Sequence, residues 1–110
     1  MEKEIVIDLG SVGDLSRSAF LSGKERGKDA RAHFLLDEVE KRDGQIVIRI
    51  PLEIASISSS YSLGLFSESV SKFGSIEKFI EKYTFDGNPE IVERIILALH
   101  RGASGPPKLN

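Results

Sequence analysis

The chain has 110 residues, of which 40% are hydrophobic and 29% charged, and this length and composition predict one soluble globular domain. Its 15 Lys and Arg against 17 Asp and Glu leave a net charge of −2, which gives no electrostatic case for binding nucleic acid or an anionic membrane. Cysteine is absent, so disulfides and thiolate metal sites are excluded. The charged start Met1–Glu4 and the lack of a long apolar run favour a cytoplasmic protein without a signal peptide or a membrane span.

The first predicted element is a strand. Ile5–Leu9 is a β-branched run that Gly10 and then Gly13 bring to an end. The segment 14–23 leaves two alternatives open. Arg17–Leu21 forms either a short strand that pairs back on the first strand or part of a loop.

A helix is predicted from about residue 24 to residue 42, because apolar side chains recur there at spacings of three and four residues. These side chains are Ala32, Leu35, Leu36 and Val39. Asp43 and Gly44 end the helix, and the apolar run Gln45–Ile50 predicts a second strand, closed by Pro51. Its continuous apolar character is typical of a central strand covered on both faces.

A second helix is predicted after Ser58–Ser60 and up to Gly74, with an apolar face. This face comprises Leu63, Phe66, Val70 and Phe73. The segment 79–85 alternates like a third strand, less buried than the second. Asn88 as N-cap and Pro89 at the first position begin the last helix. That helix turns Ile91, Val92, Ile95, Ala98 and Leu99 inward and ends near Arg101–Gly102.

The alternation of strands and helices predicts an α/β fold: a small single domain with a mixed, mostly parallel sheet and packed helices over residues 1–101. Residues 102–110 are expected to be a disordered C-terminal tail. The sheet is expected to have 45–50 as its central strand. The side chains expected to pack on it are Leu35, Val39, Phe66, Val70, Ile95 and Leu99.

No enzymatic chemistry is indicated. The two histidines have no third ligand at a useful spacing, and no general base is tied by sequence to a serine. Gly23–Lys28 faintly resembles a phosphate-binding loop but lacks the order Gly-x-x-x-x-Gly-Lys-Ser/Thr. Lys24, Arg26 and Arg31 are therefore only a weak candidate anion site, and no cofactor or metal is expected.

Ser58, Ser59 and Ser60 are the candidate regulatory site, because a phosphate at a helix N-terminus is favoured by the dipole and the free N–H groups. The simpler interpretation is a plain N-cap. Tyr61 and Leu65 lie opposite the apolar face on a helical wheel, so we expect them to be exposed and to contact a partner.

The strand Val47–Ile50, followed by Ile57–Tyr61 and a helix, resembles the core of the STAS-like domains, a bacterial family of unknown function related to anti-sigma-factor antagonists. Ser59-Ser60-Tyr61 stands where that family has a Ser-Ser-Phe-like helix start, and Ser22–Arg31 resembles its Arg- and Gly-containing first-helix start. The chain departs from the pattern at Ile50-Pro51, where the family has Asp-Phe, and at Leu63-Gly64, where it has acidic residues. Ser58 replaces the Asp that precedes the phosphorylated serine of the antagonists.

The resemblance implies a non-enzymatic regulatory module that binds another protein, of the histidine-kinase-like ATPase or anti-sigma type, with serine phosphorylation as the switch. Two alternatives stay open. One is a self-associating structural domain, such as a homodimer, from a phage or bacterial defence operon. The other is a nucleotide-binding protein that uses the segment 23–31.

Overall fold

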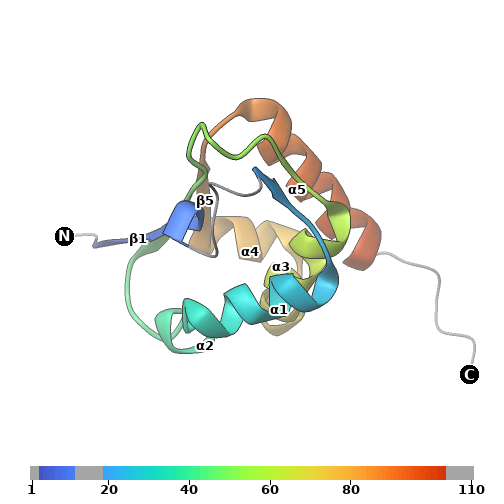
Figure 1. The fold of residues 1–110 in the computed structure, drawn as a ribbon. Coiled ribbons are helices and arrows are strands. Elements are labelled where there is room, and N and C mark those ends of the chain that lie inside the picture. Colours follow the sequence, from blue (N-terminus) through green and yellow to red (C-terminus); the bar gives the residue numbers. More distant parts are fainter. Residues whose placement is uncertain (1–2, 12–18, 104–110) are drawn as a thin grey trace, which may run out of the picture.

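The computed structural model describes residues 3–11 and 19–103 (Figure 1). Its strands are β1 (Glu4–Asp8), β2 (Phe20–Leu21), β3 (Gln45–Arg49), β4 (Ser56–Ile57) and β5 (Tyr83–Asp86). Its α-helices are α1 (Lys24–His33), α2 (Leu36–Val39), α3 (Ser59–Phe73), α4 (Ile76–Lys82) and α5 (Pro89–Ala103), and the 3-10 turn η1 (Leu9–Ser11) follows β1. The α/β class is therefore confirmed.

The strands form two parallel sheets. In the larger sheet β3 lies between β1 and β5, with Ile46 beside Ile5 on one side and beside Tyr83 on the other. In the smaller sheet Leu21 of β2 lies beside Ile57 of β4. All strand pairs among the described residues are parallel, and β3 is the central strand, as the sequence predicts.

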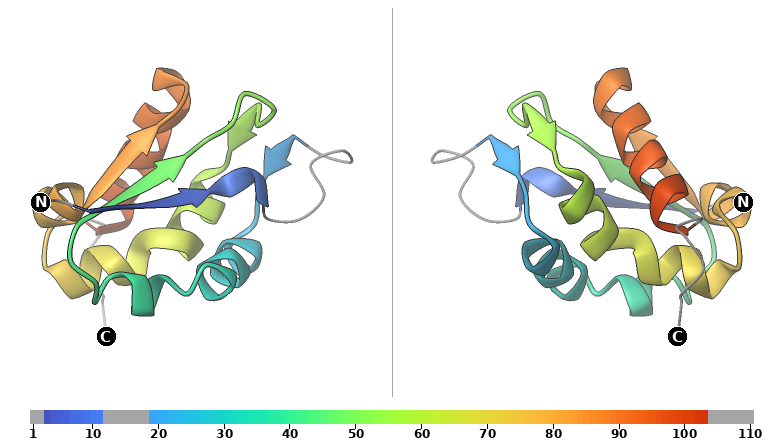
Figure 2. Two further views of the ribbon diagram at one scale, coloured as in Figure 1. Left: turned by 90° about the vertical axis from the view of Figure 1, so that its left-hand side faces the viewer. Right: turned by 90° about the vertical axis from the view of Figure 1, so that its right-hand side faces the viewer.

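The helices cover one face of the larger sheet. Figure 2 shows the strands in front of α5 from one side and α5 in front of the strands from the other. Ile46 and Ile48 are fully buried, whereas Val47 is only half-buried and Arg49 is exposed. The expectation that this strand is covered on both faces is therefore wrong, because alternate side chains of β3 face solvent.

Aromatic rings fill the space between the sheet and the helices. Phe79 stacks on Tyr83 with ring centroids 4.6 Å apart, and Phe66 meets both rings edge-on. Of the side chains expected in this core, five are buried: Val39, Phe66, Val70, Ile95 and Leu99. Leu35 is the exception, since 61% of it is exposed.

The helix expected over 24–42 breaks in the middle. Leu35 adopts the left-handed conformation, with φ 56° and ψ 47°, and separates α1 from α2. The break turns Leu36 and Val39 into the core and leaves Ala32 and Leu35 outside. The four apolar side chains therefore do not share one helical face.

The strand expected at 79–85 begins only at Tyr83, because residues 76–82 form α4. Ser75 caps this helix, and its Oγ accepts a hydrogen bond from the Lys78 N–H at 3.2 Å. Ile76 and Phe79 are buried one turn apart, a spacing that suits a helix as well as alternation suits a strand.

Both long helices begin as their caps predict, and α3 also ends where its C-cap glycine predicts. Ser58 caps α3, Gly74 ends it in the left-handed conformation, and Asn88 Oδ1 accepts from the Glu90 N–H at 2.8 Å at the start of α5. Within 14–23, Phe20–Leu21 is a strand that pairs with β4 and not with the first strand. Residues 12–18 and most of the expected tail, 104–110, lie outside the described residues, whereas Gly102 and Ala103 still belong to α5.

Candidate functional site

The serine turn, Ser58–Ser60, lies at the start of α3, directly after β4. Ser58 is half-buried, and its Oγ accepts from the Tyr61 N–H at 3.0 Å. Ser59 and Ser60 are exposed. The expectation of at least one solvent-accessible serine at this helix start is confirmed, and the structure separates one capping serine from two accessible ones.

The start of α1 lies against the start of α3. A Cβ atom at Gly27 would lie 2.3 Å from Tyr61 O, and one at Gly64 would lie 2.1 Å from Lys24 O. Such distances leave no room for a side chain, so the two backbones touch. The two glycines therefore bring the first turns of both helices together.

Lys24 and Arg26, two of the three candidate anion-binding residues, are exposed in the first turn of α1. Burial raises the pKa of Tyr61, and the positive charge of nearby Arg26 opposes this rise. The serine turn and two exposed cations thus occupy one end of the α1–α3 pair.

The structure contradicts the expected exposure of Tyr61 and Leu65, since each is 1% exposed. A helical wheel with one apolar face leaves them outside, but α3 packs against α5 on one flank and α1 on the other. A Cβ at Gly27 would reach Leu65 N at 3.0 Å, which shows how closely α1 covers this side. Neither residue is available to a partner in this fold.

Arg31, the third candidate anion-binding residue, is 6% exposed and committed to partners inside the protein. Its Nη1 donates to Leu65 O at 2.9 Å and to Ser69 Oγ at 2.7 Å, and its Nη2 donates to Asp37 Oδ1 at 2.7 Å. The guanidinium therefore ties α1 to α3 and to α2. Its assignment to an anion site with Lys24 and Arg26 is wrong.

Glu40 is the buried counter-charge, with a side chain that is 5% exposed. Its Oε2 lies 3.8 Å from Arg31 Nη2 and accepts hydrogen bonds from Ser69 Oγ and Tyr83 Oη. Burial, and next the hydrogen bond to Glu40, raise the pKa of Tyr83 far above its usual value. Tyr83 therefore stays a neutral donor.

Asp37 and Lys72 close this buried polar cluster at the surface. Lys72 Nζ lies 2.8 Å from Asp37 Oδ1 and 3.2 Å from Glu40 Oε1. The hydrogen bond to Asp37 raises the pKa of Lys72. Hydrogen bonds from Lys72 and Arg31 lower the pKa of Asp37 to about 2. The cluster joins α1, α2, α3 and β5, and no local spacing in the sequence connects its members.

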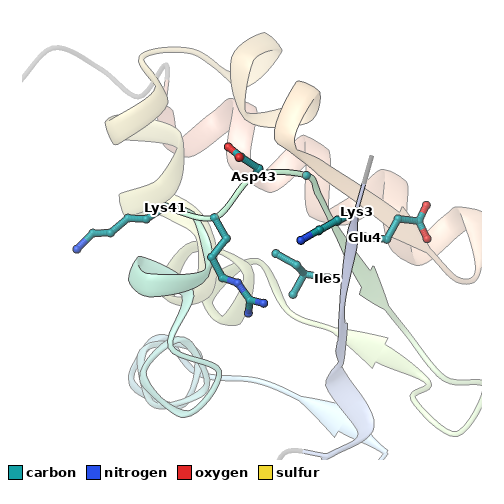
Figure 3. A pocket seen from close by; sticks show the side chains of 7 residues that line it. Lys3, Glu4, Ile5, Lys41 and Asp43 are labelled. Carbon is teal, nitrogen blue, oxygen red and sulfur yellow. The ribbon is translucent and has the colours of Figure 1, made fainter. Parts of the chain in front are cut away.

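One hollow lies at the amino end of β1 and is lined by none of the residues of the serine turn (Figure 3). Its volume is about 660 Å³, and its lining is Lys3, Glu4, Ile5, Lys41, Arg42, Asp43 and Gly44. In Figure 3 the side chains of Lys3 and Ile5 point toward the space beside β1, whereas Glu4 points to the other side of the strand. Except for Ile5 and Gly44, the residues of the lining are charged.

In the described part of the chain, His, Asp and Glu form no group suited to hold a metal ion. None of the helices there has the length and apolar character that a bilayer span needs. Comparisons of the chain with protein-family models, with curated proteins and with solved structures found no match.

Proposed function

We propose that this protein is a non-enzymatic regulatory module that binds another protein, and that phosphorylation of Ser59 or Ser60 switches the binding. One observation supports the proposal above all. Two exposed serine hydroxyls occupy the first turn of α3, and the first turn of α1, which carries the exposed Lys24 and Arg26, packs against Gly64 in the next turn of α3. The serine turn is thus accessible to a kinase and to a partner.

A kinase would transfer the γ-phosphoryl group of ATP to the serine Oγ, which loses its proton. The product adds roughly −1.5 to −2 charges at neutral pH. The first N–H groups of α3 have no acceptor within the helix and point toward this position, and the helix dipole favours an anion there. Lys24 and Arg26 add positive charge nearby. The domain therefore tolerates the phosphate, whereas a partner surface docked on the uncharged turn would meet a new anion.

The resemblance to STAS-like domains supports the same assignment and suggests a histidine-kinase-like ATPase or an anti-sigma protein as the partner. Ser58 stands where the antagonists have an Asp before the phosphorylated serine. Here Ser58 is the N-cap of α3, a role that Asp also fills well. The substitution therefore preserves the helix start, and Ser59 and Ser60 remain the phosphate acceptors that we propose.

The test uses four forms of the full chain as bait in lysate from its native cells: the parent, Ser59→Asp/Ser60→Asp, Ser59→Ala/Ser60→Ala, and Ser71→Asp. Ser71 is exposed near the other end of α3 and controls for added charge. The proposal expects one protein that the parent, the Ala form and Ser71→Asp retain and the double Asp form loses. If all four baits retain the same proteins equally, the serine turn is only a helix cap and the proposal is wrong.

A further inference from the structure

The junction between α1 and α2 exposes a large apolar side chain in an unfavourable backbone conformation. Leu35 is the only non-glycine residue with positive φ among the described residues, and 61% of it is exposed. Helix ends in the left-handed conformation usually carry Gly or Asn, because a Cβ atom crowds the following carbonyl. Leu35 thus combines a backbone conformation that is unfavourable for a residue with a Cβ atom and the exposure of a large apolar side chain. Such combinations in native chains point to function.

A hollow of about 410 Å³ adjoins Leu35. It is lined by Lys28, Arg31, Ala32, Leu35, Leu36, Asp37, Glu38 and Glu68. The apolar side chains of this lining are Ala32 of α1, Leu35 at the junction and Leu36 of α2, and the remaining side chains are charged. The volume falls within the range of about 300–1,000 Å³ typical of ligand pockets, and it is large enough for one long apolar side chain and its neighbour.

Two carboxylates at the rim are only loosely neutralised. Glu68 is 63% exposed, and its Oε1 lies 3.7 Å from Arg31 Nε, on a guanidinium that already serves Asp37 and Glu40. Glu38 is 69% exposed, and its Oε2 lies 3.6 Å from Lys41 Nζ. Both separations exceed ordinary hydrogen-bond length. The charged side chains of the lining are the carboxylates Asp37, Glu38 and Glu68 and the cations Lys28 and Arg31, so the lining carries a net negative charge that favours a cation from a partner.

We propose that Ala32 and Leu35, with Glu38 and Glu68, form a docking site for a segment of a partner protein that presents a large apolar side chain beside a Lys or Arg. The apolar side chain packs on Leu35 and the floor, and the cation pairs with Glu68 or Glu38. The inference rests on the proposed function only in taking the partner to be a protein.

The test selects peptides from a random phage-displayed library on the immobilised full chain. We expect the enriched peptides to share an apolar residue beside Lys or Arg. A synthetic copy should bind the parent, as measured by fluorescence anisotropy, and weaken by about tenfold for Leu35→Asn and for Glu38→Gln/Glu68→Gln. Asn tolerates the left-handed conformation, so Leu35→Asn keeps the fold. Leu52→Asn, at a leucine that is 94% exposed elsewhere, is the matched control and should leave affinity unchanged.

Three results would overturn this docking site: no enrichment, enriched peptides without the pattern, or affinity unchanged by both junction variants. Peptides that lose binding to Ser59→Asp/Ser60→Asp but not to Leu35→Asn would also overturn it, while supporting the serine turn as a partner surface. Peptides that depend on Leu35 and Glu68 would support it even if the serine switch fails. The two proposals therefore fail separately.

Discussion

Glu40 is the residue on which the buried polar cluster depends. Its carboxylate accepts from Ser69 and Tyr83, and it is a buried counter-charge of Arg31. Glu40→Ala leaves a buried guanidinium short of its partner, so we expect it to lower the free energy of unfolding by about 3–5 kcal/mol in urea denaturation. Glu38→Ala, at an exposed ion pair two residues earlier in α2, should cost no more than about 0.5 kcal/mol. Similar losses for both variants would show that the cluster does not stabilise the fold.

Asp37 makes a contribution to fold stability that depends on pH. Its pKa in the folded state, about 2, lies below the usual 3.8, first through the hydrogen bond from Lys72 and next through that from Arg31. A depressed pKa means that ionised Asp37 stabilises the fold above about pH 4 and that this contribution disappears as the pH falls toward 2. Because the side chain is 59% exposed, solvent screening keeps the effect below about 1 kcal/mol.

The measurement compares urea midpoints of the parent and Asp37→Asn between neutral and acidic pH. The difference between the two proteins should be largest near neutral pH and shrink on acidification. Asp29→Asn, at an exposed carboxylate of α1, provides the control and should track the parent throughout. A constant difference between parent and Asp37→Asn would contradict the linkage.

At Leu35, in contrast to Glu40 and Asp37, we expect a substitution to stabilise the fold. Replacing it with glycine removes the steric cost of the left-handed conformation, of about 1–2 kcal/mol, against a smaller loss of chain entropy. Leu35→Gly should therefore raise the free energy of unfolding by roughly 0.5–1 kcal/mol. Thermal or urea unfolding that shows a clear loss instead would mean that the exposed side chain makes stabilising contacts.

At the scale of elements, the contact between α1 and α3 depends on the absence of two side chains. Gly64→Ala would place a Cβ 2.1 Å from the Lys24 carbonyl oxygen, a backbone atom that cannot give way without moving α1. We expect a loss of about 1–3 kcal/mol despite the better helix propensity of Ala. Gly102→Ala is the matched control: its Cβ would meet Leu63 Cδ2, the end of a flexible side chain, at 2.4 Å. Circular dichroism melts should separate the two variants clearly, and equal melting temperatures would contradict the packing.

Elements that are defined by their own caps could be predicted from the sequence. Ser58 and Gly74 bound α3, and Asn88 with Pro89 begins α5, because capping depends on residues only a few positions apart. The break at Leu35 could not be predicted, since local spacing permits an unbroken helix there. The helix α4 does have a local cap, Ser75, but the alternation over 79–85 favours a strand at the same place. Burial of Leu36 and Phe79 against distant parts of the chain decides both.

In the whole molecule and its candidate site, too, features set by neighbouring residues could be predicted and features set by distant contacts could not. The parallel sheet with β3 at its centre follows from alternating strands and helices, and the accessible serines follow from a helix start. The partners of Arg31 lie up to 38 residues away and Tyr83 lies 43 residues from Glu40, so no local pattern connects them. The burial of Tyr61 and Leu65 is likewise decided by α1, which a helical wheel of α3 leaves out.

The central claim is that phosphate on the serine turn releases a partner from a domain that stays folded. The most direct measurement is the Kd of the captured partner for protein carrying phosphoserine at position 59 or 60, incorporated during synthesis, with the unfolding midpoint of the same samples. We expect the Kd of at least one phosphorylated form to rise by about tenfold or more while its midpoint is unchanged or higher, since the start of α3 accommodates an anion. An unchanged Kd for both forms, or a weaker affinity only together with a lower midpoint, would contradict the claim.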